Sequence, residues 1–203
     1  MIFGIDVSNH QGQIDWGLAS FVAQFAFVKA TEGTVYTDPF FLANWEGAKK
    51  NGLVRGAYHF ARPSSNTGRE EALYFIHATS AVFGPGDIAI LDSEDPLVSP
   101  TADLLAHHID FENTLREYGY PLPVLYSSRA YIDAHNLSGL AARNWGLWIA
   151  DWQTGAEPRL PAGWAFYAAW QYGFGQVPGV QGSVDLDIFN GSREQLLKYG
   201  KVA

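Results

Sequence analysis

The chain has 203 residues, of which 47% are hydrophobic, with a formal net charge of −8 and no cysteine. This length supports one sizeable core, so we expect a single domain over residues 1–203. The negative charge argues against nucleic acid and anionic membrane surfaces as partners. The lack of cysteine excludes disulfides and thiolate metal sites. No apolar run reaches the roughly 18 residues of a membrane-spanning helix.

The N-terminal segment MIFGIDVSNHQ has no basic region and no long apolar core, so it does not read as a signal peptide. Short runs rich in β-branched and aromatic residues then recur, each flanked by Gly, Pro, Asp or Ser, and they predict strands. These predicted strands are residues 3–8, 25–31, 54–60, 88–94, 123–128, 146–152, 165–173 and 184–189.

Helical stretches separate the earlier strands. Asp38 followed by Pro39 predicts a helix start, and the helical runs are 38–50, 68–81, 101–118 and 129–142. Residues 9–24 have room only for a short helix, while the linkers 152–165 and 173–184 are rich in Pro and Gly and have little room for any. Ser192 begins a last helix, with Gln195 completing a capping box.

This alternation of strands and helices predicts an α/β fold with a parallel sheet. So many strands in one domain of this size favour closure into a barrel. A full barrel of eight strands and eight helices needs ~250 residues. The length that this chain lacks is about that of two helices, and no helix is predicted after the sixth or the seventh strand. The sequence therefore predicts an irregular TIM-like barrel.

Acidic residues gather at the predicted strand ends. Asp92 and Glu94 are two positions apart, so their side chains share one face at the C-terminal end of the fourth strand, where barrel enzymes carry their active sites. Asp6, Glu32 and Asp185 end or begin other strands in the same way. Carboxyls that converge without matching bases raise one another's pKa values, and a general acid needs such a carboxyl. The alternatives are turn-capping acids, or a metal site that includes His59, for which no HxH or HExxH spacing appears.

Aromatic side chains are also frequent at the strands. Aromatic rings stack on the apolar faces of sugars while acids and amides bind hydroxyls, so a groove of both kinds suits a carbohydrate; the alternative is that the rings fill the core. The chain has no GxSxG elbow, GxGxxG loop or Walker loop. The aromatic residues on or at the ends of strands are Tyr58, Tyr126, Trp148, Trp152, Trp170 and Tyr172.

Eight segments occur in an order that resembles glycoside hydrolase family 25, the Chalaropsis-type lysozymes. The resemblance covers residues 3 to about 191. Each segment alone is weak evidence for the family, but all eight in this order make the resemblance specific. The segments are FGIDVSNHQGQIDW, FVKATEG, GAYHFARP, ILDSE, VLYSS, LWIADW, WQYG and VDLDIFNG.

The resemblance implies an irregular barrel of five β/α units followed by three strands. It implies a muramidase that hydrolyses the β-1,4 bond between N-acetylmuramic acid and N-acetylglucosamine, acting as a monomer on peptidoglycan strands without a cofactor or metal. Glu94 matches the family's general acid, and Asp92 matches the residue that assists the sugar's N-acetyl group or stabilises the developing positive charge. Asp6 and Asp185 match acids that line the catalytic subsite. The positions that match substrate-binding residues are Glu32, Tyr58, Tyr126, Trp148 and Gln171.

Two positions depart from the family pattern. Ser93 replaces an aliphatic residue between the two acids, and Asp187 stands where the family often has Asn, so either Asp185 or Asp187 could face the sugar; we favour Asp185. The group that attacks the anomeric carbon is a protein carboxylate, a water or the substrate's acetamido oxygen, and the pairing of Asp92 with Glu94 favours the last. The main rival function is a non-catalytic glycan-binding barrel. Wall-degrading chemistry without a signal peptide is typical of a phage endolysin or a trimmed secreted protein.

Overall fold

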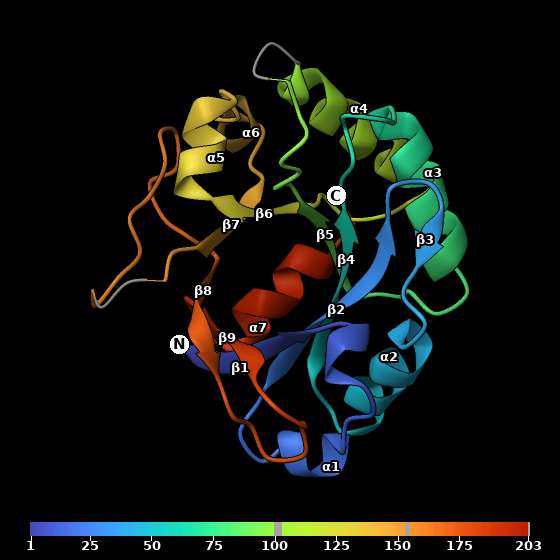
Figure 1. Cartoon of the computed structure of the whole chain (residues 1–203), viewed down its shortest axis with the longest axis vertical. Helices are drawn as coiled ribbons and strands as arrows, with labels where there is room; N and C mark the ends of the chain where they lie inside the picture. The colour runs from blue at the N-terminus through green and yellow to red at the C-terminus, as the bar shows by residue number, and fades with distance from the viewer. Residues whose placement is uncertain (100–102, 153–154, 203) are drawn as a thin grey trace.

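The computed structural model describes residues 1–99, 103–152 and 155–202. Its strands belong to one sheet that closes because β1 (Ile2–Val7) pairs with both β2 (Phe25–Glu32) and β9 (Val184–Phe189). The two-residue β3 (Tyr36–Thr37), which the sequence did not predict, pairs with the end of β2. From β2 the closed ring continues through β4 (Val54–Phe60), β5 (Ile88–Asp92), β6 (Val124–Ser128), β7 (Gly146–Ala150) and β8 (Ala169–Gly175) to β9 (Figure 1).

Strand direction places most strand ends at one rim. Neighbours from β1 through β8 around the ring are parallel, whereas β9 is antiparallel to both β8 and β1. The C-terminal ends of the parallel strands therefore meet at one rim, and the N-terminal end of β9 joins them there. This mixed closed barrel confirms the predicted fold class.

The helices follow the predicted order. They are η1 (Asn9–Gln11) and α1 (Trp16–Ala19) in the first linker, then α2 (Phe41–Lys50), α3 (Gly68–Thr79), α4 (Leu104–Glu117), α5 (Arg129–Ala134) and α6 (Gly139–Ala142), and finally α7 (Arg193–Leu196) and η2 (Leu197–Gly200). The described part of 151–168 holds no helix, yet β7 and β8 are parallel. A coil of this length is enough for a parallel crossover, which a helix usually makes. None of the helices described is both long and apolar enough for a membrane span.

Some predicted boundaries were wrong for local reasons. The helix predicted from 38 begins at Phe41, because Asp38 accepts hydrogen bonds from the backbone N–H groups of Asn9 and Phe40, each at 2.8 Å, and holds a turn. The helix predicted over 129–142 is two short helices, between which Asn136 adopts a left-handed φ of 54°. The strand predicted from 165 begins only at Ala169.

Helix caps account for two further boundaries. Residues 101–102 of the predicted fourth helix lie outside the described residues, and α4 starts after Asp103, whose carboxylate accepts from the backbone N–H of Ala106. The capping box of Ser192 and Gln195 is present as predicted.

Two apolar layers hold the barrel. The outer layer fills the space between the strands and the helices around them, and α2, α3 and α4 cover the outside of β2, β4 and β5 (Figure 1). The inner layer fills the barrel itself with Phe25, Phe27, Ile90 and Trp148 among others. Large inward rings need small neighbours, and a Cβ on Gly4 would collide with the ring of Phe25. The interior is thus a packed floor beneath the rim, as in other barrels of this kind.

Candidate active site

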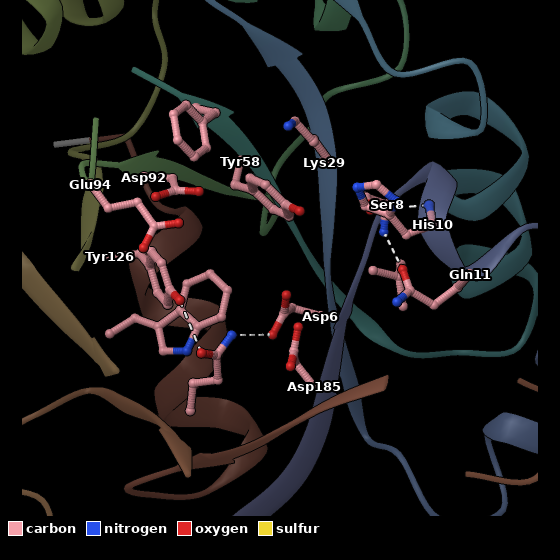
Figure 2. Close-up of a pocket in the computed structure, with 14 residues that line it drawn as sticks. Asp6, Ser8, His10, Gln11, Lys29, Tyr58, Asp92, Glu94, Tyr126 and Asp185 are labelled. Carbon is pink, nitrogen blue, oxygen red and sulfur yellow. Dashed lines mark hydrogen bonds between the residues drawn. The ribbon is translucent and has the colours of Figure 1, made fainter. Parts of the chain in front are cut away.

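A cavity of about 210 Å³ opens at this rim. Side chains from all eight strands of the closed ring and from the segments after β1 and β5 line it (Figure 2). Its lining includes four carboxyls that the sequence singled out and one lysine. The lining residues are Asp6, Val7, Ser8, His10, Gln11, Lys29, Tyr58, Phe60, Asp92, Glu94, Tyr126, Trp148, Gln171 and Asp185.

Strand periodicity brings Asp92 and Glu94 to the same cavity. Ile90 lies fully buried in the barrel floor, Asp92 is the last residue of β5, and Glu94 extends the same face two positions further. The close-up shows both carboxyl groups directed into the cavity (Figure 2). The predicted sharing of one face is therefore present in the structure.

Asp6 and Asp185 meet across the β1–β9 ladder. They are directly paired in the antiparallel register, and Asp6 accepts a hydrogen bond of 2.8 Å from the side-chain amide of Gln171. Burial, and after it the charge of Asp185, raises the pKa of Asp6 to about 7. Near neutral pH this pair therefore holds a proton that an ordinary aspartate would have lost.

Asp187 occupies a deeper position on the same face of β9. It is fully buried, accepts a 2.8 Å hydrogen bond from the indole N–H of Trp148, and is not among the residues that line the cavity. Burial, and then the nearby charge of Asp6, raises its pKa well above the ordinary value. Of the two aspartates left open by the sequence, Asp185 is the one that faces the cavity.

Asp92 and Glu94 also hold their protons more tightly than exposed carboxyls. Burial and the charge of Glu94 raise the pKa of Asp92 well above its usual range, and one oxygen of Asp92 has no hydrogen-bond partner among the described residues. Glu94 is more exposed, but desolvation within the cavity raises its pKa too; the positive charge of Lys29 opposes this shift and the negative charge of Asp185 adds to it. A carboxyl that stays protonated near neutral pH can give its proton to a leaving group.

Lys29 is a cavity residue that the sequence analysis missed. Its amino group lies 2.6 Å from a carboxylate oxygen of Glu32 and 5.1 Å from the centre of the Phe60 ring. The alternation of Phe25, Phe27 and Lys29 along β2 was the available signal, because positions two apart on a strand share a face. The converging acids therefore do have a basic neighbour.

Glu32 lies behind Lys29 and is not among the residues that line the cavity. It accepts hydrogen bonds from Lys29 and from the guanidinium of Arg62, which also contacts Asp95 at 3.2 Å. Partial burial works to raise the pKa of Glu32, but the hydrogen bonds from Lys29 and Arg62 outweigh it and hold the pKa below the ordinary value. Glu32 is thus an ionised anchor for two cations.

The predicted substrate-binding aromatics form the floor and wall of the cavity. Trp148 is 2% exposed and packs against Phe27 and Tyr126, with ring centroids 4.7 and 4.3 Å away. The hydroxyl of Tyr126 donates a 2.9 Å hydrogen bond to Gln171. Burial, followed by nearby carboxylates, raises the pKa values of Tyr58 and Tyr126, so both remain neutral phenols that can donate hydrogen bonds.

His59 does not reach this site. It is fully buried on the outer side of the barrel wall, where its ring nitrogens contact Thr31 at 2.7 Å and Glu71 at 3.1 Å. His59 is therefore a core histidine whose two ring nitrogens both have partners. Within the three described stretches, no group of three or more His, Asp or Glu side chains is placed to hold a metal ion.

Comparison with known proteins identifies the family of this chain. The model of the glycosyl hydrolases family 25 matches residues 5–180. Lysozyme M1 of Streptomyces globisporus is 35% identical over 96% of this chain and 69% of its own length. The N,O-diacetylmuramidase of a Chalaropsis species is 30% identical over 90% of this chain and 95% of its own length.

A solved structure is similar along the whole chain. The bacterial lysozyme of Streptomyces coelicolor superposes with a TM-score of 0.84 at 33% identity, over 98% of this chain and 96% of that one. The agreement therefore extends to the late strands β8 and β9, which carry Gln171 and Asp185.

Proposed function

This chain belongs to glycosyl hydrolase family 25 and is a muramidase that cleaves the β-1,4 bond between N-acetylmuramic acid and N-acetylglucosamine in peptidoglycan, and on this premise we propose how its residues perform the hydrolysis. One observation carries the proposal: Asp6, Asp92, Glu94 and Asp185 come from three distant parts of the chain and line one cavity. Such a group of carboxyls with raised pKa values is typical of a glycosidase active site.

Glu94 is the general acid. It is placed beyond the end of β5 where a leaving-group oxygen can approach, and its pKa is raised above that of a free glutamate. Protonation of the glycosidic oxygen lets the bond to the anomeric carbon break through an oxocarbenium-like transition state. Lys29 limits the rise of this pKa, which keeps the acid strong enough to release its proton.

Asp92 assists the substrate's own acetamido group. Its carboxyl lies on the same face as Glu94 and lines the cavity, where it can accept the N–H of that group. The acetamido oxygen, thus oriented, attacks the anomeric carbon to form a bicyclic intermediate that water then opens. Attack by a protein carboxylate would form a covalent glycosyl-enzyme, and attack by water would give the product directly, so an inhibitor that mimics the bicycle separates the first route from both.

Asp6 and Asp185 stabilise the positive charge that develops on the sugar ring. The Gln171 amide holds Asp6 in place, and Asp185 lies across the ladder from it. Because carboxylates in a site that excludes water interact strongly with a developing cation, this pair lowers the barrier electrostatically.

The remaining polar groups position the sugar. Tyr58, Tyr126, Trp148 and Gln171 form the surface against which the sugar rests, and the hydrogen bonds from Tyr126 to Gln171 and from Gln171 to Asp6 hold this surface in place. Glu32 acts through Lys29, whose amino group it holds at the cavity edge.

A single chain supplies every one of these groups, so we propose that the protein acts as a monomer and that residues 1–203 work as one catalytic domain on the bacterial cell wall. The common sheet of the described strands supports the single unit. Because the chain is acidic, we propose that nucleic acid is not among its partners.

The test is the identity of the sugar ends released from purified peptidoglycan. Borohydride reduction of the digest converts each new reducing end into an alditol, and we expect muramitol from the wild-type protein and none from Glu94→Gln. Release of glucosaminitol would identify a different bond. Binding to peptidoglycan with no new reducing ends would instead support the non-catalytic barrel.

A further inference from the structure

Two exposed aromatic rings stand beside the catalytic cavity. Trp152 follows β7 and Phe174 lies on β8, and they are 56% and 63% exposed. Their ring centroids are 5.5 Å apart with a tilt of 56°. Large aromatic rings left in water next to a polar cavity are unusual, because burying a ring of this kind stabilises by ~1.5–3 kcal/mol.

A β-bulge directs Phe174 toward the cavity side of the sheet. Gln171 pairs with Asp187 in the β8–β9 ladder, but after a register shift Phe174 pairs with Asp185. Cross-strand partners point to the same face, and Asp185 and Asp187 share the inner face of β9. The extra residue in β8 thus places Gln171 and Phe174 on one face although they are three positions apart, which regular alternation would forbid.

Trp152 is fixed to the same wall. Its indole N–H donates a 3.0 Å hydrogen bond to the side-chain oxygen of Gln171, which also accepts from Tyr126 and holds Asp6. The indole ring is therefore held in one orientation relative to the cavity while its face stays in contact with solvent.

We propose that Trp152 and Phe174 form an aromatic subsite for a further sugar of the glycan strand, beyond the residues at the cleaved bond. The inference rests on the proposed function, since it supposes a glycan in the cavity. At about 210 Å³ the cavity is smaller than the ~300–1,000 Å³ of pockets that enclose a whole ligand, so a polymer must continue across the rim. Rings stack on the apolar faces of sugars, and this pair is continuous with the cavity wall through Asp185 and Gln171.

The decisive variant is Phe174→Ala, tested with peptide-free glycan strands of two and of eight sugars. Phe174 makes no hydrogen bond with its side chain, and its exposure keeps the effect on folding small. We expect the variant to bind the long strand about tenfold more weakly, with the same loss in kcat/KM, and to leave the two-sugar fragment unaffected. Phe174→Tyr keeps an aromatic face and should match the wild type.

Two matched variants control for the loss of an exposed ring elsewhere and for the loss of the indole hydrogen bond. Phe166 is 64% exposed and precedes β8, toward the opposite rim, so Phe166→Ala removes an exposed ring away from the cavity and should change nothing. Trp152→Phe keeps an aromatic face but removes the N–H bonded to Gln171; we expect it to retain the preference for long strands while lowering kcat.

Equal affinity of Phe174→Ala and wild type for the long strand would overturn the inference while leaving hydrolysis by the wild type intact. Self-association of the wild type that Phe174→Ala abolishes, measured by light scattering, would overturn it in favour of a contact between copies. A wild-type protein that releases no sugar ends would reject the proposed function itself, which is a separate result.

Discussion

Asp6 and Asp185 face each other across the β1–β9 ladder, and one of them keeps a proton up to about pH 7. The pair comes from the two ends of the chain, and only closure of the barrel brings it together. Asp6 is buried and Asp185 beside it is half-buried, so ionising both carboxyls is costly and folding brings a repulsion into the site. Because the two carboxyls are close, the free energy of unfolding should depend on pH, and this dependence tests their proximity.

The first prediction concerns Asp6→Asn and the free energy of unfolding. Because burial and Asp185 raise the pKa of Asp6 from 3.8 to about 7, the folded chain binds this proton more tightly than the unfolded chain. The resulting stabilisation is fully present below about pH 4 and is lost as the pH rises through about 7. Asn cannot titrate, so the stability of the wild type should fall relative to the variant between these pH values, as measured by chemical denaturation. A difference between the two proteins that does not change with pH would contradict the shifted pKa.

The second prediction separates Asp185 from Asp187. Asp185→Asn removes a charge from the cavity and should lower kcat by about tenfold or more, with little change in stability. Asp187→Asn keeps an oxygen for the indole N–H of Trp148 and removes a buried carboxyl, so this variant should keep most activity and melt at a higher temperature at pH 7. Greater loss of activity in Asp187→Asn than in Asp185→Asn would reverse our assignment.

The third prediction is that Glu94→Gln loses nearly all lytic activity, at least about a hundredfold, since a positioned general acid contributes ~10²–10⁴ to the rate. Thermal melting should show an intact fold, because Glu94 is exposed and its change to Gln leaves the packed floor of the barrel untouched. Glu117→Gln on the exposed face of α4 is the matched control for the same chemical change and should clear cell walls normally. Near-normal clearing by Glu94→Gln would reject the assignment of the acid.

Much of this site follows from strand periodicity. The period of two put Asp92 and Glu94 on one face, and strand order put Asp6 near Asp185, as the structure has them. The same rule could not separate Asp185 from Asp187, because both lie on the inner face and differ only in depth along β9. Depth depends on how far the floor residues fill the barrel, which is a property of packing rather than of sequence period.

Other features needed information that a single strand does not carry. The position of Phe174 depends on a bulge beside Gly173; a glycine inside a strand is compatible with a bulge but does not say which residues then share a face. Asp38 resembled a helix cap, but its carboxylate is bonded to Asn9 in a distant segment. Contacts of this kind are decided by tertiary structure, which overrides local preference.

The fourth prediction concerns Ser93, which lies between Asp92 at the end of β5 and Glu94. Its hydroxyl is 2.8 Å from a ring nitrogen of His108 on α4, and its carbonyl accepts a hydrogen bond from Ser127. Burial lowers the pKa of His108 to about 3, so the ring is neutral and the bond persists over the working pH range. Ser93→Ala should cost ~1–3 kcal/mol in the free energy of unfolding, because His108 loses its buried partner.

A double-mutant cycle tests this bond against simple loss of packing. Ser93→Ala combined with His108→Leu should destabilise by less than the sum of the single changes, since the second change removes the group that the first leaves unpaired. Strict additivity in denaturation measurements would mean that the two side chains do not interact.

The fifth prediction concerns salt. The chain carries a net charge of −8, and cell walls of the Gram-positive type are polyanionic, so long-range attraction cannot guide the enzyme to its substrate. At ~0.15 M salt, charges more than ~8 Å apart are largely screened, which weakens this repulsion. Lysis of whole walls should therefore rise or stay constant as salt is added from low ionic strength. A steep loss of wall lysis on adding salt would reveal an attractive contact with the wall that the charge distribution of this chain does not explain.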